Sequence, residues 1–525
     1  MKFKVQLFLF FTCLFFIHCS NKDIKEGYKN GMVVSANSLA SQVGIDILKN
    51  GGNAFDAAIG VQFALSVVYP NAGNIGGGGF VVYRLNDGSV GSLDFREKAP
   101  RKATRNMYLD DNNEVYIEKS KFGHLASGIP GSVDGMVKLH EKFGSLDWKN
   151  LLEPSIKLSK NGFKLTKNQA ISLNGVKESF LKLNDSSISL INKNEWKEND
   201  LLVQNNLYKT LERIKNDKRA GFYSGETAQL LLNEMNQGNG IFTLEDLDNY
   251  SSIWREPIIG NYKNHKIISI GPPSSGGIAL VQMLNGAEKL NVNKYEHNSK
   301  DYIHVISEIE SRVYADRATY LGDPDFFEVP SNTLISDKYL QNKFSTIDLN
   351  KKTPSSDIKE GQITMNETEE TTHFSIVDKF GNAVSITTTI NGSYGSKVVV
   401  DGAGFLLNNE MDDFSIKPGF PNMFGLTGGE ANAIEGNKRM LSSMTPTIIE
   451  KEGELFMVLG TPGGSTIITS VFQTILNVID FNMNMQEAVD SKKFHHQWSP
   501  DVIVIEKNTI KILCFFCLKI SHAHY

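Results

Sequence analysis

The sequence predicts a mixed α/β (α+β) fold in which stacked β-sheets are covered by helices. Three regions of the chain indicate this arrangement. Apolar residues recur at helical spacing over residues 38–68, and residues 135–247 are mostly helical and charged. After residue 370 the chain changes to short runs rich in β-branched and aromatic residues. Helical outer segments around a strand-rich centre are typical of sheets stacked face to face beneath helices.

The composition is that of a globular protein without a surface for nucleic acid. The 525 residues are 40% hydrophobic and 22% charged, and the formal net charge is -5. Acidic and basic residues are interspersed, so no basic patch stands out that would bind nucleic acid or an anionic membrane. The length suffices for one large domain or for two or three ordinary ones. We therefore expect a small molecule as the partner and no nucleic acid.

Glycine-rich breaks divide the first half of the chain into predicted elements. Gly51-Gly52-Asn53 interrupts the helical pattern of residues 38–68 and predicts two helices there. The glycine run 76–79 precedes a strand, whereas a dinucleotide-binding loop would open a helix and would need glycine where Val82 stands. Further elements predicted in this half are a strand at 80–85, a second strand ending at 93–96, and a loop at 269–277 that opens a helix.

A predicted linker runs directly into a predicted β-hairpin. Residues 351–370 are polar and lack periodicity. Alternating runs at 373–377 and 383–390 flank an Asp-x-x-Gly-Asn turn. If the turn centres on Phe380, Thr371 lies directly across from Thr389 on the same face. Threonine is also simply a favourable strand residue, so this register alone leaves the role of the pair open. Strands are also predicted at 405–407, 447–449 and 456–459, and a helix at 465–478.

The N-terminus has the organisation of a signal peptide. Lys2 and Lys4 precede an apolar run at 7–17, which is too short to cross a membrane, and a polar exit follows. A buried helix is the alternative. The residues before Cys19 loosely resemble a lipoprotein box, although His18 stands where a small residue is usual. We expect residues 1–19 to be a signal peptide and the protein to be exported, either periplasmic or lipid-anchored at the cell envelope.

Common cofactor, metal and nucleophile motifs fail in this chain. The stretch 460–465 lacks the lysine of a phosphate-binding loop, and there is no H-E-x-x-H zinc helix. His495 and His496 are adjacent and point different ways on a helix or a strand, which favours packing over metal binding. No cysteine lies between Cys19 and Cys514, which excludes a disulfide framework or a cysteine nucleophile in the body of the chain. We expect neither a metal nor a cofactor.

Ten separate stretches, in one order, resemble the γ-glutamyltransferases, which are N-terminal-nucleophile hydrolases. The resemblance covers residues 27–506 and includes Leu93-Asp94-Phe95-Arg96 and Thr371-Thr372-His373. So many blocks in the same order make it specific. The matching stretches are 51–58, 73–80, 93–100, 272–277, 315–324, 371–373, 407–414, 441–446, 461–465 and 494–498.

The resemblance implies a four-layer αββα sandwich that is split by self-cleavage between Glu370 and Thr371. A large subunit, 24–370, and a small catalytic subunit, 371–507, would form a heterodimer from one precursor. Cleavage would give Thr371 a free α-amine, whose ordinary pKa of about 8 suits proton transfer from its own hydroxyl.

Family counterparts imply further catalytic roles. Thr389 would orient the amine or the hydroxyl of the nucleophile. The backbone N–H groups of Gly463 and Gly464 would form the oxyanion hole, where glycine permits close approach of the main chain.

A γ-glutamyl group carries an α-carboxylate and an α-ammonium, so its site must supply both signs of charge. By resemblance, a guanidinium and two hydroxyls grip the carboxylate, while carboxylates and an amide hold the ammonium. The expected substrate-binding residues are Arg96, Asn391, Glu410, Asp413, Ser442 and Ser443. The implied substrate is glutathione or a related γ-glutamyl amide, whose acyl group passes through an enzyme ester to water or to an amino acid or peptide.

The chain departs from the family pattern at two places. Segment 418–429 resembles a lid, but Phe424 stands where some bacterial members have a tyrosine that bonds to the counterpart of Asn391, so we expect closure by packing. The resemblance ends near Glu506, and the atypical tail 508–525 indicates a truncated or frameshifted reading frame. Two alternative functions remain: a related β-lactam side-chain acylase, and an inactive, unprocessed product of the truncated frame.

Overall fold

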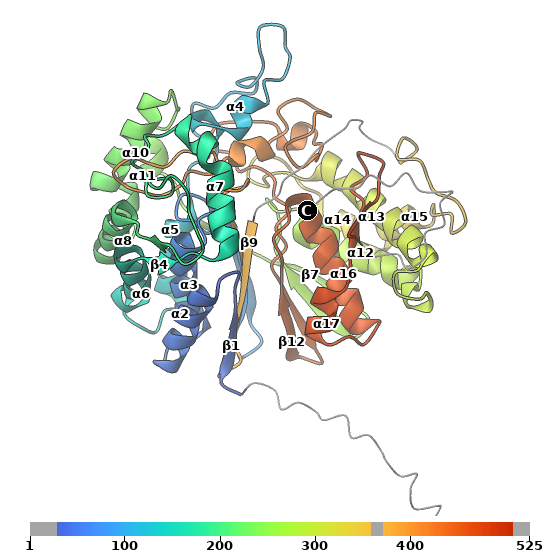
Figure 1. Cartoon of the computed structure of the whole chain (residues 1–525). Helices are drawn as coiled ribbons and strands as arrows, with labels where there is room; N and C mark the ends of the chain where they lie inside the picture. Colours follow the sequence, from blue (N-terminus) through green and yellow to red (C-terminus); the bar gives the residue numbers. More distant parts are fainter. Residues whose placement is uncertain (1–28, 359–370, 508–525) are drawn as a thin grey trace, which may run out of the picture.

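Two antiparallel sheets form the centre of the protein, as a computed structural model of residues 29–358 and 371–507 describes (Figure 1). The six-stranded sheet has the order β1-β9-β10-β2-β3-β6, and the four-stranded sheet has the order β12-β11-β8-β7. The strands of the first are β1 (Gly31–Val34), β2 (Gly78–Arg84), β3 (Val90–Asp94), β6 (Ile253–Arg255), β9 (Thr371–Asp378) and β10 (Ala383–Thr389). Those of the second are β7 (Ile258–Tyr262), β8 (His265–Ser269), β11 (Thr447–Lys451) and β12 (Glu454–Leu459).

Helices cover the outer face of each sheet (Figure 1). On the six-stranded sheet, α3 packs against β9 and β10; on the four-stranded sheet, α12 packs against β7 and β8. The helices of the first side are α2 (Ser38–Lys49), α3 (Ala54–Val68), α4 (Glu118–Lys121), α5 (Ser132–Phe143), α6 (Trp148–Asn161), α7 (Lys167–Leu181), α8 (Asn205–Asp217), α9 (Ala220–Tyr223), α10 (Gly225–Gln237) and α11 (Leu244–Asp248). Those of the second are α12 (Gly276–Lys289), α13 (Lys300–Tyr320), α14 (Ser331–Leu334), α15 (Asp337–Phe344), α16 (Ile467–Ile479) and α17 (Met485–Asp490).

Four further strands are short and belong to neither main sheet. Two small two-stranded sheets lie outside the main ones. They are built from β4 (Phe163–Lys164) with β5 (Leu201–Leu202), and from β13 (Phe494–His495) with β14 (Val504–Ile505).

The inner faces of the two main sheets bury an apolar layer between them. Phe80 and Val82 of β2 pack in one cluster with Ile268 of β8 and Ile448 of β11. Burial of such side chains is the main stabilising contribution to a sandwich of this kind. The predicted αββα arrangement of stacked sheets beneath helices is therefore confirmed.

The break predicted between the first two helices is built from their caps. The Asn37 side chain accepts from the backbone N–H of Leu39 at the start of α2. Asn53 caps α3, where its side chain and that of Asp56 form a reciprocal capping box. The asparagine after the glycine pair therefore begins the second helix, as the sequence predicted.

The register predicted for the hairpin is confirmed, and one predicted strand is wrong. Thr371 of β9 pairs with Thr389 of β10 across the antiparallel ladder. Residues 405–407 do not form a strand; Leu406 makes only an isolated bridge with Val399. Phe405 is buried and its ring lies 5.2 Å from that of Phe222. The apolar run thus signals burial of a loop.

Residues 1–28, 359–370 and 508–525 lie outside the described part of the chain. The predicted signal peptide, the end of the predicted linker with Glu370, and the predicted tail fall on them. Within 29–358 and 371–507, no helix combines the length and the apolar character needed to cross a membrane.

Candidate active site

The β9–β10 hairpin places Thr371 at the start of a strand in the middle of the molecule. Asp378 organises the turn, because its Oδ1 accepts from the backbone N–H groups of Phe380 at 2.9 Å and Asn382 at 3.0 Å. Its Oδ2 accepts from the backbone N–H of Ala54 at 3.0 Å, which ties the turn to the start of α3. This anchored turn fixes the register that brings Thr371 opposite Thr389.

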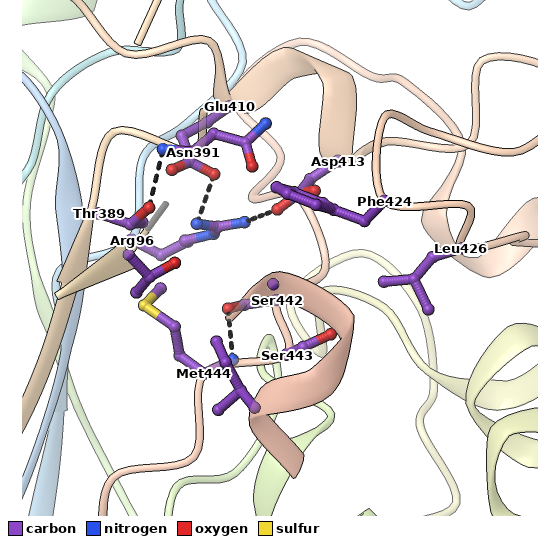
Figure 2. Close-up of a pocket in the computed structure, with 13 residues that line it drawn as sticks. Arg96, Thr389, Asn391, Glu410, Asp413, Phe424, Leu426, Ser442, Ser443 and Met444 are labelled. Carbon is purple, nitrogen blue, oxygen red and sulfur yellow. Dashed lines mark hydrogen bonds and ion pairs between the residues drawn. The ribbon is translucent and has the colours of Figure 1, made fainter. Parts of the chain in front are cut away.

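One pocket at the open end of the hairpin gathers nine of the eleven predicted site residues (Figure 2). They are Arg96, Thr371, Thr389, Asn391, Glu410, Asp413, Ser442, Ser443 and Gly464. Gly463 is adjacent to Gly464 but does not line the pocket, and Glu370 lies outside the described residues. Phe424, Leu426, Met444 and Ile467 complete the lining.

A cluster of opposite charges lies at the centre of the pocket. The Arg96 guanidinium is 1% exposed. Its Nη1 lies 2.6 Å from Glu410 Oε2, and its Nη2 donates to Asp413 Oδ2 at 2.5 Å (Figure 2). A third carboxylate, that of Glu97, lies 3.7 Å from Nη1. One buried guanidinium therefore faces three carboxylates. Glu410 and Asp413 each contact one of its two terminal nitrogens.

Burial shifts the pKa of each acidic group in this cluster upward. Loss of hydration raises the pKa of Glu97 to about 8, against the lowering effect of Arg96. Burial also raises the pKa of Glu410 well above its ordinary value and raises that of Asp413. For Arg96, burial disfavours the charge, but Glu410, Asp413 and Glu97 raise its pKa. The guanidinium is therefore always charged, and the third carboxylate holds a proton near neutral pH.

Thr389 and Asn391 form a tight turn at the end of β10. The Thr389 hydroxyl oxygen accepts from the backbone N–H of Asn391 at 2.7 Å (Figure 2). Asn391 adopts the left-handed conformation, with φ of 69°. Its side-chain amide donates to the backbone oxygen of Asn409 at 2.9 Å. The Thr389 side chain also hydrogen-bonds to the Glu410 carboxylate, and Thr389 lines the pocket together with Thr371.

The two serines are acceptors within the protein. Ser442 Oγ accepts from the backbone N–H of Met444 at 3.0 Å (Figure 2). Ser443 Oγ accepts from Arg317 Nη2 at 3.1 Å. No hydrogen bond donated by either hydroxyl is present among the described residues, so both O–H groups are available to an anion in the pocket.

Arg317 of α13 is a site residue that the sequence analysis did not single out. Its guanidinium is buried, and it also donates through Nε to Ser275 Oγ at 3.1 Å. In residues 29–358 and 371–507, no carboxylate lies within ion-pair distance of it. It lies in the matching stretch 315–324, so the signal was present, but nothing in the sequence connects it to Ser443.

His373 is close to the nucleophile in sequence but is not placed to act as its base. Its Nδ1 lies 3.0 Å from Thr387 Oγ1 and its Nε2 lies 2.9 Å from Ser375 Oγ. Burial lowers the pKa of His373 to about 3, so the ring is neutral in the physiological range. Among residues 29–358 and 371–507, no histidine lines the pocket, and the carboxylates that line it face Arg96.

Segment 418–429 covers the pocket through Phe424 and Leu426 (Figure 2). A β-carbon added to Gly464 would lie 2.7 Å from the Phe424 ring, so glycine is required there, and its φ of 44° also favours glycine. Phe424 packs against Gly464, in line with closure by packing, and a hydrogen bond of its neighbour adds to this packing. The sulfur of Met423, beside Phe424, accepts from Asn391 Nδ2 at 3.6 Å.

The comparisons with known proteins agree with this geometry. A model of the gamma-glutamyltranspeptidase family matches residues 40–514, and so extends past Glu506, where the resemblance was expected to end. The glutathione hydrolase proenzyme of Escherichia coli (strain K12) is 45% identical over 495 residues, which cover 92% of this chain and 85% of that protein.

Two solved structures share the fold. The gamma-glutamyltranspeptidase of Helicobacter pylori is 43% identical, with a TM-score of 0.62, over 65% of this chain and 99% of that one. The cephalosporin acylase of Bacillus halodurans is 25% identical, with a TM-score of 0.77, over 92% of this chain and 86% of that one.

A threonine at the head of a central strand, in an αββα sandwich, is the arrangement of an N-terminal-nucleophile hydrolase. Among these, the family match over most of the chain and the identity of 45% to a glutathione hydrolase proenzyme are decisive. The chain belongs to the gamma-glutamyltranspeptidase family.

Proposed function

We propose that this protein is a γ-glutamyltransferase with glutathione hydrolase activity that matures by cutting itself between Glu370 and Thr371. The observation that carries the proposal is the shared pocket of Thr371 and Arg96, in which a nucleophile meets a zwitterion-binding cluster. The large and small subunits, 24–370 and 371–507, stay together as a heterodimer because β9 and β10 pair with β1 and β2 of the large subunit.

In this structure Arg96 is paired with Glu410 and Asp413. The donor binds by forming new ion pairs with these same groups. Its α-carboxylate takes the place of one carboxylate on Arg96 and accepts from the hydroxyls of Ser442 and Ser443. Its α-ammonium binds between Glu410 and Asp413, one of which has been released from Arg96, with Asn391 nearby. A zwitterion brings no net charge into the buried site, so the exchange avoids the cost of burying an unpaired ion.

Acyl transfer then follows from the position of Thr371. Its free α-amine accepts the proton of its own hydroxyl as the oxygen attacks the γ-carbonyl carbon. Thr389 orients the nucleophile, and the N–H groups of Gly463 and Gly464 stabilise the oxyanion. The amine of the leaving group takes the proton and departs, leaving a γ-glutamyl ester on Thr371. Water or the amine of an acceptor then attacks the ester and restores the threonine.

The purified full chain tests this proposal directly. On a denaturing gel it should give two bands, and N-terminal sequencing of the smaller should begin at Thr371. A γ-glutamyl anilide should release the free aniline, and glutathione should release glutamate. A single band together with no aniline release would refute the proposal and would favour the unprocessed product.

Export completes the proposed function, because residues 1–19 have the pattern of a signal peptide. We infer a location in the periplasm or on a lipid anchor at Cys19. Fractionation of expressing cells, with mass determination of the mature N-terminus, distinguishes the two. Activity confined to the cytosolic fraction, on a chain that still begins at Met1, would contradict export.

A further inference from the structure

The segment 418–429 closes the donor pocket in this structure. Phe424 is 3% exposed and its ring lies against Gly464. The cavity that remains has a volume of about 20 Å³. That volume accommodates a water molecule but no acyl group bearing a carboxylate and an ammonium. A donor needs more room than this arrangement leaves, and movement of the segment, controlled by the contacts that hold it, would provide that room.

Asn391, which lines the pocket, and Asn409, next to Glu410 in the chain, both contact the segment at one sulfur atom. Asn391 Nδ2 lies 3.6 Å from Met423 Sδ, and Asn409 Nδ2 lies 3.5 Å from it. Two further hydrogen bonds hold the segment elsewhere: Asn422 Nδ2 donates to Asp413 Oδ1 at 3.0 Å, and the Met423 N–H donates to Asp412 Oδ2 at 2.7 Å. The Met423 thioether is thus the side-chain contact between the segment and Asn391.

The orientation of both amides is fixed independently of the sulfur. Asn391 Nδ2 also donates to the Asn409 backbone oxygen at 2.9 Å, so that atom must be the nitrogen. Asn409 Oδ1 accepts from the backbone N–H of Gly392 at 2.8 Å, so its other terminal atom must be the nitrogen. Each amide therefore directs an N–H at Met423 Sδ, and a thioether can only accept.

We propose that the thioether of Met423 is a latch that holds 418–429 closed over the donor pocket, and that this sulfur is a site of reversible oxidation that releases the latch. A hydroperoxide would transfer one oxygen atom to Sδ, with two electrons passing from sulfur to the peroxide and the matching alcohol or water leaving. Met423 is half-buried and within reach of such an oxidant, whereas the pocket residue Met444 is buried.

Oxidation changes the contact because the amide nitrogens are already close. With nitrogen to sulfur distances of 3.5 and 3.6 Å, an oxygen added along either contact would lie closer to that nitrogen than an N–H···O hydrogen bond allows. The segment must then withdraw or the side chain must turn outward. The polar sulfoxide also loses the apolar packing of the methionine.

Met423→Leu and a matched control, Met485→Leu, test the latch. Leucine keeps the apolar volume but cannot accept a hydrogen bond or be oxidised. Met485 is 41% exposed on α17 and lies outside the pocket. Amide hydrogen exchange of 418–429, with peptide mass mapping of sulfoxides, is measured on each full chain before and after mild hydrogen peroxide. The kcat and KM for a γ-glutamyl anilide are measured in parallel.

We expect Met423→Leu to exchange 418–429 about 3- to 10-fold faster than the unaltered protein, since two weak hydrogen bonds are lost. Because the closed segment leaves no room for the donor, a larger open population should lower KM, with a smaller effect on kcat. Peroxide should shift the exchange of 418–429 and the KM of the unaltered protein and of Met485→Leu toward the values of Met423→Leu. Methionine sulfoxide reductase should reverse both shifts. Met423→Leu should not respond to peroxide.

Equal exchange of 418–429 in Met423→Leu and the unaltered protein would overturn the latch. An equal peroxide-induced change of KM and of exchange in both would overturn the oxidation site and would indicate a different methionine. The turnover measurement rests on the proposed function, but the exchange measurement does not. Absence of turnover in every variant would therefore refute the function while the exchange rates still decide the latch.

Discussion

Replacement of Arg96 by lysine separates substrate recognition from self-cleavage. The guanidinium contacts Glu410 and Asp413 through two different nitrogens, at 2.6 and 2.5 Å. A lysine keeps the charge, so the buried carboxylates stay compensated, but one ammonium cannot reproduce the two-pronged geometry. Loss of one charge-assisted hydrogen bond costs about 1.5–3 kcal/mol, or about 10- to 150-fold in kcat/KM.

The assay compares two rates in the same preparation. Turnover of a γ-glutamyl anilide should fall by that factor, whereas conversion of precursor to two bands should change less than about 3-fold, because the precursor presents no free γ-glutamyl head group. Arg101→Lys is the matched control, since Arg101 is an exposed arginine whose ion pair with Glu245 lies at the surface. Parallel loss of turnover and processing in Arg96→Lys would show that Arg96 is structural.

Three further changes test the nucleophile, a buried acid and the hairpin turn. Thr371→Ala should remain one inactive chain on a denaturing gel, while Thr371→Ser should still process; cleavage of the alanine variant would refute the mechanism. The Glu97 carboxyl, with its pKa of about 8 when folded, holds a proton that the unfolded chain releases at about 4.3. Its contribution to the free energy of unfolding is therefore complete below the lower value and is lost as the pH rises toward the higher one. In urea titrations, the free energy of unfolding of Glu97→Gln should fall less between these two pH values than that of the unaltered protein. Equal decreases would contradict the raised pKa of Glu97. Asp378→Ala should lose about 2–4 kcal/mol of unfolding free energy, since it leaves buried N–H groups unpaired. Asp87→Ala, in the exposed turn between β2 and β3, should lose under about 1 kcal/mol in the same urea titration, and equal losses would refute the anchoring role.

Local signals predicted the hairpin, and its tertiary support was not predictable. The Asp-x-x-Gly-Asn turn fixed the pairing of Thr371 with Thr389 because both strands are short and directly connected. The bond from Asp378 to the backbone of Ala54 joins residues 324 positions apart, and no periodicity indicates it. The apolar run at 405–407 was wrongly predicted to be a strand, because a buried loop and a buried strand have the same apolar composition.

The resemblance selected residues that meet in one pocket, but it did not indicate the contacts that hold them there. Nine of the residues it selected line one cavity. It gave no sign that the sulfur of Met423 would contact Asn391 and Asn409, because that contact depends on how segment 418–429 folds back over the pocket. Arg317 likewise belongs to a matching stretch, but its hydrogen bond to Ser443 spans 126 positions. Contacts at such separations follow from the packed fold alone.

The charge balance of the pocket separates the two substrate classes that share this fold. Arg96 is paired with Glu410 and Asp413, and a donor carboxylate must displace at least one of them. A donor that also carries an ammonium gives the displaced carboxylate a new partner. An acyl donor with a carboxylate but no ammonium would leave that carboxylate buried and unpaired, at a cost of several kcal/mol unless it took up a proton. The cost of leaving Glu410 unpaired is smallest at low pH. Burial already raises its pKa, so Glu410 takes up a proton readily there. Selection for the zwitterionic head group should therefore be strongest at high pH, and a glutaryl anilide, which lacks the ammonium, measures it. The ratio of kcat/KM for the γ-glutamyl over the glutaryl anilide should increase as the pH rises, and a ratio independent of pH would show that these carboxylates do not select the donor.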